Sequence, residues 1–146
     1  MHQSVNFIRE NVVRELLDRG ADSNALDDAG NSPLHWAARR PSLAIVTLII
    51  DAGADVKCSN RSGSTPLHDA AVNGIESVCA KLLDAGSDAN AQDKKGRTPL
   101  HHASSSGFPG VIAVLLQGGA NRAIKDKDGK IASECAPDKS TKEAFE

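Results

Sequence analysis

Aromatic residues are scarce in this chain: Phe, Trp and Tyr make up 3% of its 146 residues, with one Trp and no Tyr. The hydrophobic fraction is nevertheless 40%, so the core must be built mainly from Ala, Leu, Ile and Val. Small aliphatic side chains suit closely packed helices better than a sandwich of sheets with large aromatic anchors. The composition therefore favours a helical protein.

Cysteine, net charge and long apolar runs are also limited. The three cysteines have no paired spacing, which argues against a disulfide framework. A net charge of -2 gives no overall attraction to nucleic acid or to anionic membranes. The longest apolar run, around residues 48–50, is too short to span a bilayer, and the N-terminus lacks the apolar core of a secretion signal. We therefore expect a reduced, cytoplasmic or nuclear protein, monomeric alone, that neither inserts into membranes nor binds nucleic acid.

An internal repeat of 33 residues runs through the chain. Three copies of a Ser/Thr-Pro-Leu-His segment place proline at positions 33, 66 and 99. One set of glycines keeps the same step at 30, 63, 96 and 129, and a second set keeps it at 20, 53, 86 and 119. A period of this length predicts a solenoid in which each unit stacks on its neighbours.

Each unit predicts a turn followed by two short helices. A glycine in the turn can adopt positive φ, and Ser or Thr before Pro is typical of a helix N-cap with proline in the first turn. Apolar residues then recur at helical spacing and predict the second helix. The expected N-caps are Ser32, Thr65 and Thr98, and the expected helix-ending glycines are Gly53, Gly74, Gly86, Gly107 and Gly119.

Two prolines depart from this pattern. Pro41 occupies the place of the glycine that ends the first helix in the other units, so we expect an altered connection there. Pro109 precedes a second helix, and we expect it to fix the first turn of that helix.

The Thr-Pro-Leu-His-x-Ala segments closely resemble the hallmark of the ankyrin repeat family. The resemblance implies an all-α solenoid of paired antiparallel helices with β-turn or hairpin fingers, and it covers one domain, residues 1–146. Residues 27–59, 60–92 and 93–125 resemble full repeats. Residues 1–26 resemble a partial N-terminal repeat without the Thr-Pro-Leu-His segment, and residues 126–146 resemble a degenerate C-terminal capping repeat.

The resemblance also implies a partner-binding surface along the concave groove and the finger tips, at positions that vary between repeats. The last fingers are mildly basic, which fits either a solvated face or complementarity to an acidic partner. Trp36 is either an interface anchor or packs against the N-terminal unit or a finger. By register, the expected partner-binding residues are Asp28, Asn31, Trp36, Arg39, Arg40, Arg61, Ser64, Asp69, Asn73, Lys94, Lys95, Arg97, His102, Ser105, Ser106 and Lys127.

Histidine and cysteine raise the question of metal or catalytic chemistry. His35, His68 and His101 recur with the period, and the resemblance implies that they hydrogen-bond within and between repeats. Equivalent residues of successive repeats are expected roughly 10 Å apart, which is too far to share a zinc ion. Cys79 is expected in the core, and a nucleophilic Cys–His pair stays open. The segment 126–129 fails as part of a calcium loop. With Gly129 as the sixth residue, the loop would have Ile124 at its first position and Cys135 at its twelfth, where carboxylates are required.

These observations predict a protein–protein interaction module, acting as a scaffold, adaptor or targeting unit. It would bind a peptide segment or a folded domain of another protein. On the same fold, the alternatives are a stand-alone inhibitor or assembly chaperone of an enzyme, or a fragment of a larger protein. An enzyme and a nucleic-acid binder are weaker hypotheses of other classes. We predict no enzymatic activity, no catalytic or metal-binding residues and no cofactor.

Overall fold

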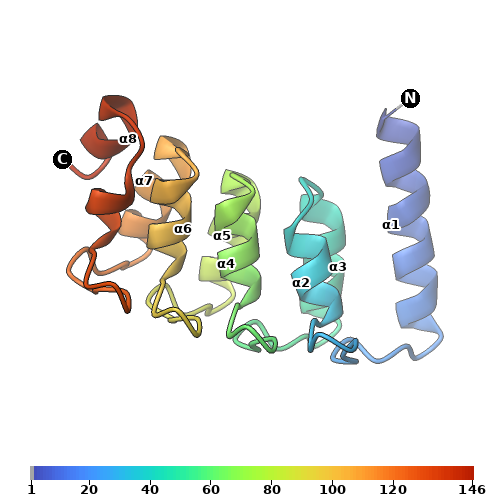
Figure 1. The fold of residues 1–146 in the computed structure, drawn as a ribbon. Helices are drawn as coiled ribbons and strands as arrows, with labels where there is room; N and C mark the ends of the chain where they lie inside the picture. The colour runs from blue at the N-terminus through green and yellow to red at the C-terminus, as the bar shows by residue number, and fades with distance from the viewer. Residues whose placement is uncertain (1) are drawn as a thin grey trace.

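The computed structural model describes residues 2–146, with side chains from residue 9 onward. Met1 and the side chains of residues 2–8, which belong to the predicted partial repeat, lie outside the described part. The described residues form eight α-helices and one 3₁₀ helix, with the two termini at opposite ends of the row (Figure 1). In chain order these are α1 (His2–Asp18), α2 (Pro33–Ala38), α3 (Leu43–Asp51), α4 (Pro66–Val72), α5 (Glu76–Asp84), α6 (Pro99–Ser105), α7 (Pro109–Gln117), η1 (Ala132–Cys135) and α8 (Lys139–Glu143).

The helices form two rows. The outer row runs α1, α3, α5, α7 and α8, and the inner row runs α2, α4, α6 and η1, with each member packed on the next of its row. The pairs α2·α3, α4·α5 and α6·α7 join the rows. The predicted all-helical solenoid is confirmed.

The inner helices begin at the predicted caps. Thr65 accepts a hydrogen bond from the backbone N–H of His68, and the His68 ring bonds back to Thr65, so that two otherwise unpaired groups at the helix start are satisfied together. Ser32 with His35 and Thr98 with His101 repeat this arrangement. The other ring nitrogen of each histidine reaches a carbonyl oxygen of the next repeat, at 2.8–2.9 Å. The predicted bonds within and between repeats are therefore present.

A finger of five residues precedes each inner helix: Asp27–Asn31, Asn60–Ser64, Asp93–Arg97 and Asp126–Lys130, called fingers 1 to 4. The first residue donates its N–H to the carbonyl of the fifth, and its side-chain oxygen accepts from the third and fifth amides. The glycine at the fourth position has φ of 74–78° in every finger, a region that favours glycine. Adjacent fingers are tied by single backbone hydrogen bonds of 3.0–3.1 Å.

The core lies between the two rows and is aliphatic, as the composition predicts. Leucines of the inner helices and Val, Ile and Leu of the outer helices are fully buried, and Cys79 is buried among them as expected. Pro109 is the first residue of α7. At the C-terminal end η1 packs on α6 and α8 packs on α7. Phe145 is buried in the core at this end.

The connection after α2 differs from those after the other inner helices, as Pro41 predicts. In the next unit a glycine with φ +74° lets the amide of Ile75 donate back to Ala70 at 3.1 Å. Pro41 cannot adopt positive φ, and the amide of Ser42 donates instead to Arg40 at 2.8 Å. As a result α2 has six residues, where α4 and α6 have seven.

Candidate partner-binding surface

The predicted partner-binding residues fall into three groups in the structure. One group lies on the last two fingers and the inner helices beside them. A second surrounds Trp36 at the N-terminal end, and it includes two residues, Asn31 and Asp69, whose side chains are largely buried. The remaining residues lie exposed or half-buried along the middle of the row: Arg61 and Ser64 on finger 2, and Asn73 at the end of α4.

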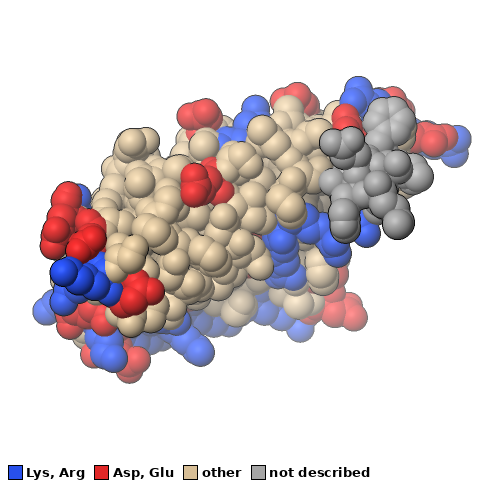
Figure 2. Space-filling model, turned by 90° about the horizontal axis from the view of Figure 1, so that it is seen from above, with Lys and Arg blue, Asp and Glu red and all other residues tan. Residues whose placement is uncertain are grey.

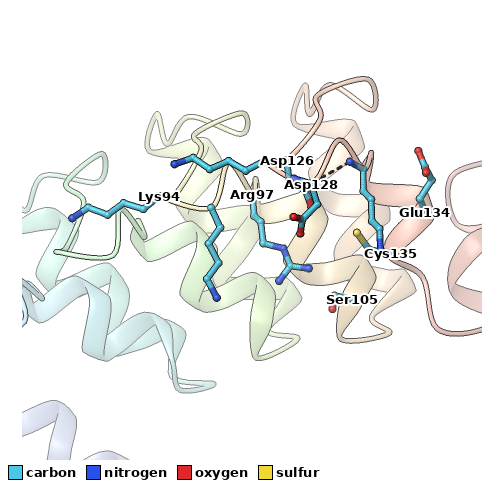
Figure 3. Close-up of a pocket in the computed structure, with 10 residues that line it drawn as sticks. Lys94, Arg97, Ser105, Asp126, Asp128, Glu134 and Cys135 are labelled. Atoms are coloured by element: carbon cyan, nitrogen blue, oxygen red, sulfur yellow. Dashed lines mark hydrogen bonds between the residues drawn. The ribbon is translucent and has the colours of Figure 1, made fainter.

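Fingers 3 and 4 form a basic surface. Lys94, Lys95 and Lys127 are exposed, Arg97 is half-buried, and Lys130 extends the row. These five side chains, here called the basic finger surface, line a hollow of about 630 Å³ between the two fingers and the ends of α6 and η1. Figure 3 shows Lys94 and Arg97 coming from one finger, Asp126 and Asp128 from the next, and Glu134 and Cys135 from η1.

Within the described part of the chain, none of the ion pairs includes a cation of this surface. Three carboxylates line the same hollow, but Asp126 already accepts two backbone hydrogen bonds in its own finger. Those bonds, chiefly the one from the Lys130 amide, lower the pKa of Asp126 below its usual value. The hollow therefore presents more free donors than acceptors, which suits an acidic ligand.

Charge is distributed unevenly between the fingers. Finger 1 has the carboxylates of Asp27 and Asp28 and no cation, whereas finger 3 has three cations. Seen from the side opposite the fingers, the middle of the molecule presents mainly neutral side chains (Figure 2). The basic surface is therefore a local feature in a protein with a net charge of -2.

The second group is held together by hydrogen bonds around Trp36. The indole N–H donates to Asp27 of finger 1 at 3.0 Å, and the Arg39 guanidinium lies 4.7 Å from the ring centre. Arg39 in turn donates to Asp69 of α4 at 3.2 Å and to Asn31 at 3.2 Å. Burial raises the pKa of Asp69, while the charge of Arg39 opposes this rise. Trp36 packs on a finger and is still 51% exposed, so both expected roles are compatible with its position.

His102 comes close to a second histidine. Its Nε2 lies 2.9 Å from Asp93, its ring meets that of His68 edge-on at 5.4 Å, and candidate ligand atoms of the three residues lie within 4.8 Å of one another. However, the Thr65 amide donates to His68 Nδ1 and Nε2 bonds the Arg97 carbonyl. This pairing fixes the proton on Nε2, so His68 has no free lone pair for a metal. Burial lowers the pKa of His68 to about 4, which keeps the ring neutral near pH 7.

The structure also brings one cysteine near a repeated histidine. Cys58 Sγ lies 3.8 Å from His35 Nδ1, but that nitrogen already accepts from the Ser32 amide, and Nε2 bonds the Ser64 carbonyl. His35 is fully buried and both of its ring nitrogens are hydrogen-bonded within the protein. Burial raises the pKa of Cys79 to about 12, so this thiol is not ionised near neutral pH. Neither cysteine has the environment of an activated nucleophile.

Sequence reasoning missed part of the N-terminal surface. Val12 and Val13 of α1 lie beside Trp36 and Arg40 and help to form a second hollow. The signal that could have found them is the lack of a Thr-Pro-Leu-His segment in residues 1–26. Among the described residues, α2 therefore has one neighbour in the inner row, which is α4. Within the part of the chain that the structure describes, no helix has the length and apolar character to cross a membrane.

Comparisons with known proteins agree with the repeat architecture. A family model for ankyrin repeats (3 copies) matches residues 1–93 and 77–139. A stretch of 49 residues is 34% identical to the neurogenic locus Notch protein of Drosophila melanogaster and covers 34% of this chain. The matched stretch spans only 2% of that relative. Ankyrin repeats are generally protein–protein interaction modules and are typically not enzymes. Because the family model matches well over half of its length, this protein belongs to the ankyrin repeat family.

Proposed function

We propose that this protein binds an acidic segment of another protein through the basic finger surface, and so acts as an adaptor or scaffold. The observation that carries the proposal is the excess of positive charge around one hollow, where five cations and three carboxylates line the surface and the cations form no ion pairs within the described part of the chain. The hollow is open and lies along two fingers, a shape that suits an extended peptide or the edge of a folded domain better than a small molecule.

The fingers give this surface a rigid base. The Lys94 amide donates to Ser62 of finger 2, and the Lys127 amide donates to Lys95 of finger 3. Because these backbone segments are already hydrogen-bonded, they have little conformational entropy left to lose when a partner binds. Because the lysine side chains remain in solvent, we expect them to act mainly on the association rate and on its salt dependence.

Charge reversal tests the proposal. Lys94→Glu combined with Lys127→Glu is compared with the wild type and with Lys142→Glu, which reverses one exposed charge on α8. The probe is a labelled decapeptide of glutamate, with a lysine decapeptide as its opposite. We expect the glutamate peptide to bind the wild type and the α8 control, and to bind the double variant at least about tenfold more weakly. Equal binding to all three proteins would exclude the basic finger surface.

A cellular partner is tested in the same way. Capture of proteins from a cell extract on immobilised wild-type protein, followed by mass spectrometry, is repeated with the double variant. The adaptor proposal expects at least one protein with an acidic segment that is retained by the wild type and lost with the variant. If the captured protein is an enzyme and this chain lowers its activity, the inhibitor alternative replaces the adaptor role.

A further inference from the structure

A second hollow lies at the N-terminal end of the solenoid, at a distance along the row from the basic finger surface. It has a volume of about 480 Å³ and is formed between α1 and the α2–α3 pair. Val12, Val13, Trp36 and Ile45 give it an apolar lining, and Arg9 and Arg40 contribute its charges. We call it the N-terminal groove.

The two helix rows explain why the groove exists. Both α4 and α6 are packed between two inner neighbours, whereas α2 packs on α4 alone in the inner row. In the outer row α1 packs on α3, so the outer row is one helix longer than the inner row at this end. Among the described residues, therefore, the inner row has no member beside α1. The groove occupies the place where the helix repeat would put one.

The groove leaves large apolar side chains in solvent. Val12 is 50% exposed and Trp36 is 51% exposed, and they lie on the two walls of one hollow. Adjacent exposed apolar residues of this size mark an interaction site more often than isolated ones do. Trp36 is also fixed in place by Asp27 and Arg39, so little of its conformational freedom remains to be lost on binding.

The charges of the groove indicate which helix it accepts. Arg9 and Arg40 are both exposed, and none of the described residues that line the groove is a carboxylate. Glu10 and Glu15 of α1 pair with Arg14 and Arg19 along the same helix. The carboxylate of Asp27 contacts the groove residue Trp36, but it accepts the indole N–H and backbone amides of its own finger. A helix with acidic residues flanking an apolar face would therefore gain two ion pairs that a basic helix would not.

We propose that the N-terminal groove binds an amphipathic helix of another protein, with small apolar residues on its buried face and acidic residues on its flanks. The bound helix would extend the inner row by one member and cover Trp36 and Val12. Its buried face would resemble that of α4, whose Leu67, Ala70 and Ala71 are fully buried in the same row. This recognition mode places a helix in an apolar groove, and it is independent of the basic finger surface.

Trp36 is the single tryptophan of the chain, so its emission reports directly on the groove. The probe is a helical peptide of about 18 residues, because much shorter helices are marginal in water. It carries Ala and Leu on one face and Glu elsewhere. Two control peptides are used: the same sequence with Lys in place of Glu, and a scrambled sequence that has no apolar face. We expect the Glu peptide to shift Trp36 emission to shorter wavelength in a saturable way, and both controls to bind at least about tenfold more weakly.

Variants separate the groove from the rest of the surface. Val12→Asp should weaken binding of the Glu peptide, whereas Val72→Asp, at an exposed site on α4 outside the groove, should not. Arg40→Glu should weaken binding of the Glu peptide and strengthen binding of the Lys peptide. A loss of folding cannot produce this exchange of preference. Lys94→Glu with Lys127→Glu should leave the emission shift unchanged, which distinguishes this proposal from the proposed function.

Three results would overturn the proposal. The first is an emission of Trp36 that does not respond to the Glu peptide. The second is equal binding to the wild type and to Val12→Asp, with circular dichroism showing that both are folded. The third is a blue shift that grows with protein concentration in the absence of peptide, because this would assign the groove to a second copy of the chain.

Discussion

Trp36 and Asp27 are joined by a hydrogen bond of 3.0 Å from the indole nitrogen to the carboxylate of finger 1. The corresponding residues of the third full repeat, His102 and Asp93, make the same connection at 2.9 Å. In each case the first residue of a finger uses one carboxylate oxygen to hold its own turn and the other to fix a side chain on the inner helix. The variable position of the helix is thereby tied to the finger that precedes it.

Asp27→Asn is expected to release Trp36. Asparagine has one oxygen, which the amides of Ala29 and Asn31 would retain, and its NH₂ group cannot accept from the indole. We expect stronger quenching of Trp36 fluorescence by acrylamide in this variant than in the wild type. Asp28→Asn, on the same finger, is the matched control, and acrylamide should quench its Trp36 fluorescence as much as in the wild type. Equal quenching in all three proteins would show that Asp27 does not orient the ring.

The finger carboxylates are expected to make stability sensitive to acid. Backbone hydrogen bonds lower the pKa of Asp27, mainly from Asn31, and of Asp126, mainly from Lys130, below the usual value of 3.8. For Asp93 burial acts in the opposite direction, but His102 and the Arg97 amide outweigh it and the pKa is again lowered. A lowered folded-state pKa gives stability that is complete above the unfolded pKa and is lost as the pH falls through the folded one.

The measurement is the urea midpoint of unfolding at pH 7 and near pH 3. We expect a lower midpoint at the acidic pH, and a smaller fall in Asp126→Asn. Asn60 of finger 2 shows that asparagine can hold this turn, since its side-chain oxygen accepts from the amides of Ser62 and Ser64. Asp128→Asn, in the same finger, is the control and should keep the acid sensitivity of the wild type. An unchanged fall in Asp126→Asn would contradict the assignment.

The repeat period predicts much of this structure, because residues that recur every 33 positions have the same role each time. The caps at Thr65 and Thr98, the positive φ of the finger glycines and the bonds of His68 and His101 all follow from it. Prediction is weaker where a residue contacts a partner distant in sequence. The sequence does not show that Arg39 reaches Asp69 across repeats, nor that this carboxylate is largely buried.

For the proposed binding surfaces, the sequence predicts the position of the residues better than their contacts. Register alone places Lys94, Arg97 and Lys127 on neighbouring fingers, and the structure brings them around one hollow. Register does not show the contribution of α1, because residues 1–26 lack the motif that anchors the alignment. Val12 therefore enters the N-terminal groove only once the packing of α1 on α3 is known.

Ser104→Ala is expected to stabilise the protein. The hydroxyl of Ser104 is the buried side-chain group without a hydrogen-bond partner in the described part of the chain, and the residue is fully buried. The equivalent positions of the other repeats, Ala38 and Ala71, have alanine. Removing an unsatisfied buried hydroxyl and improving helix propensity should raise the free energy of unfolding by about 1 kcal/mol. Thermal and urea unfolding give this value, and a loss of stability would show that the hydroxyl has a partner.

Gly63 and Gly129 offer a matched pair for measuring how fingers support each other. Both occupy the fourth position of a finger with φ +78°, so alanine introduces the same backbone strain at each site. At Gly63 a Cβ would lie 2.8 Å from the Lys94 amide nitrogen of the next finger, whereas at Gly129 nothing lies within 4 Å. We expect Gly129→Ala to lower the free energy of unfolding by roughly 1 kcal/mol from backbone strain alone.

Gly63→Ala should lower the free energy of unfolding by more, because the added methyl group separates fingers 2 and 3 and weakens the bond from Lys94 to Ser62 at 3.1 Å. Urea unfolding of the two variants measures the difference, and faster amide exchange at Lys94 in Gly63→Ala would locate it. Equal losses of stability would mean that the contact between these fingers contributes nothing beyond the conformation of each turn.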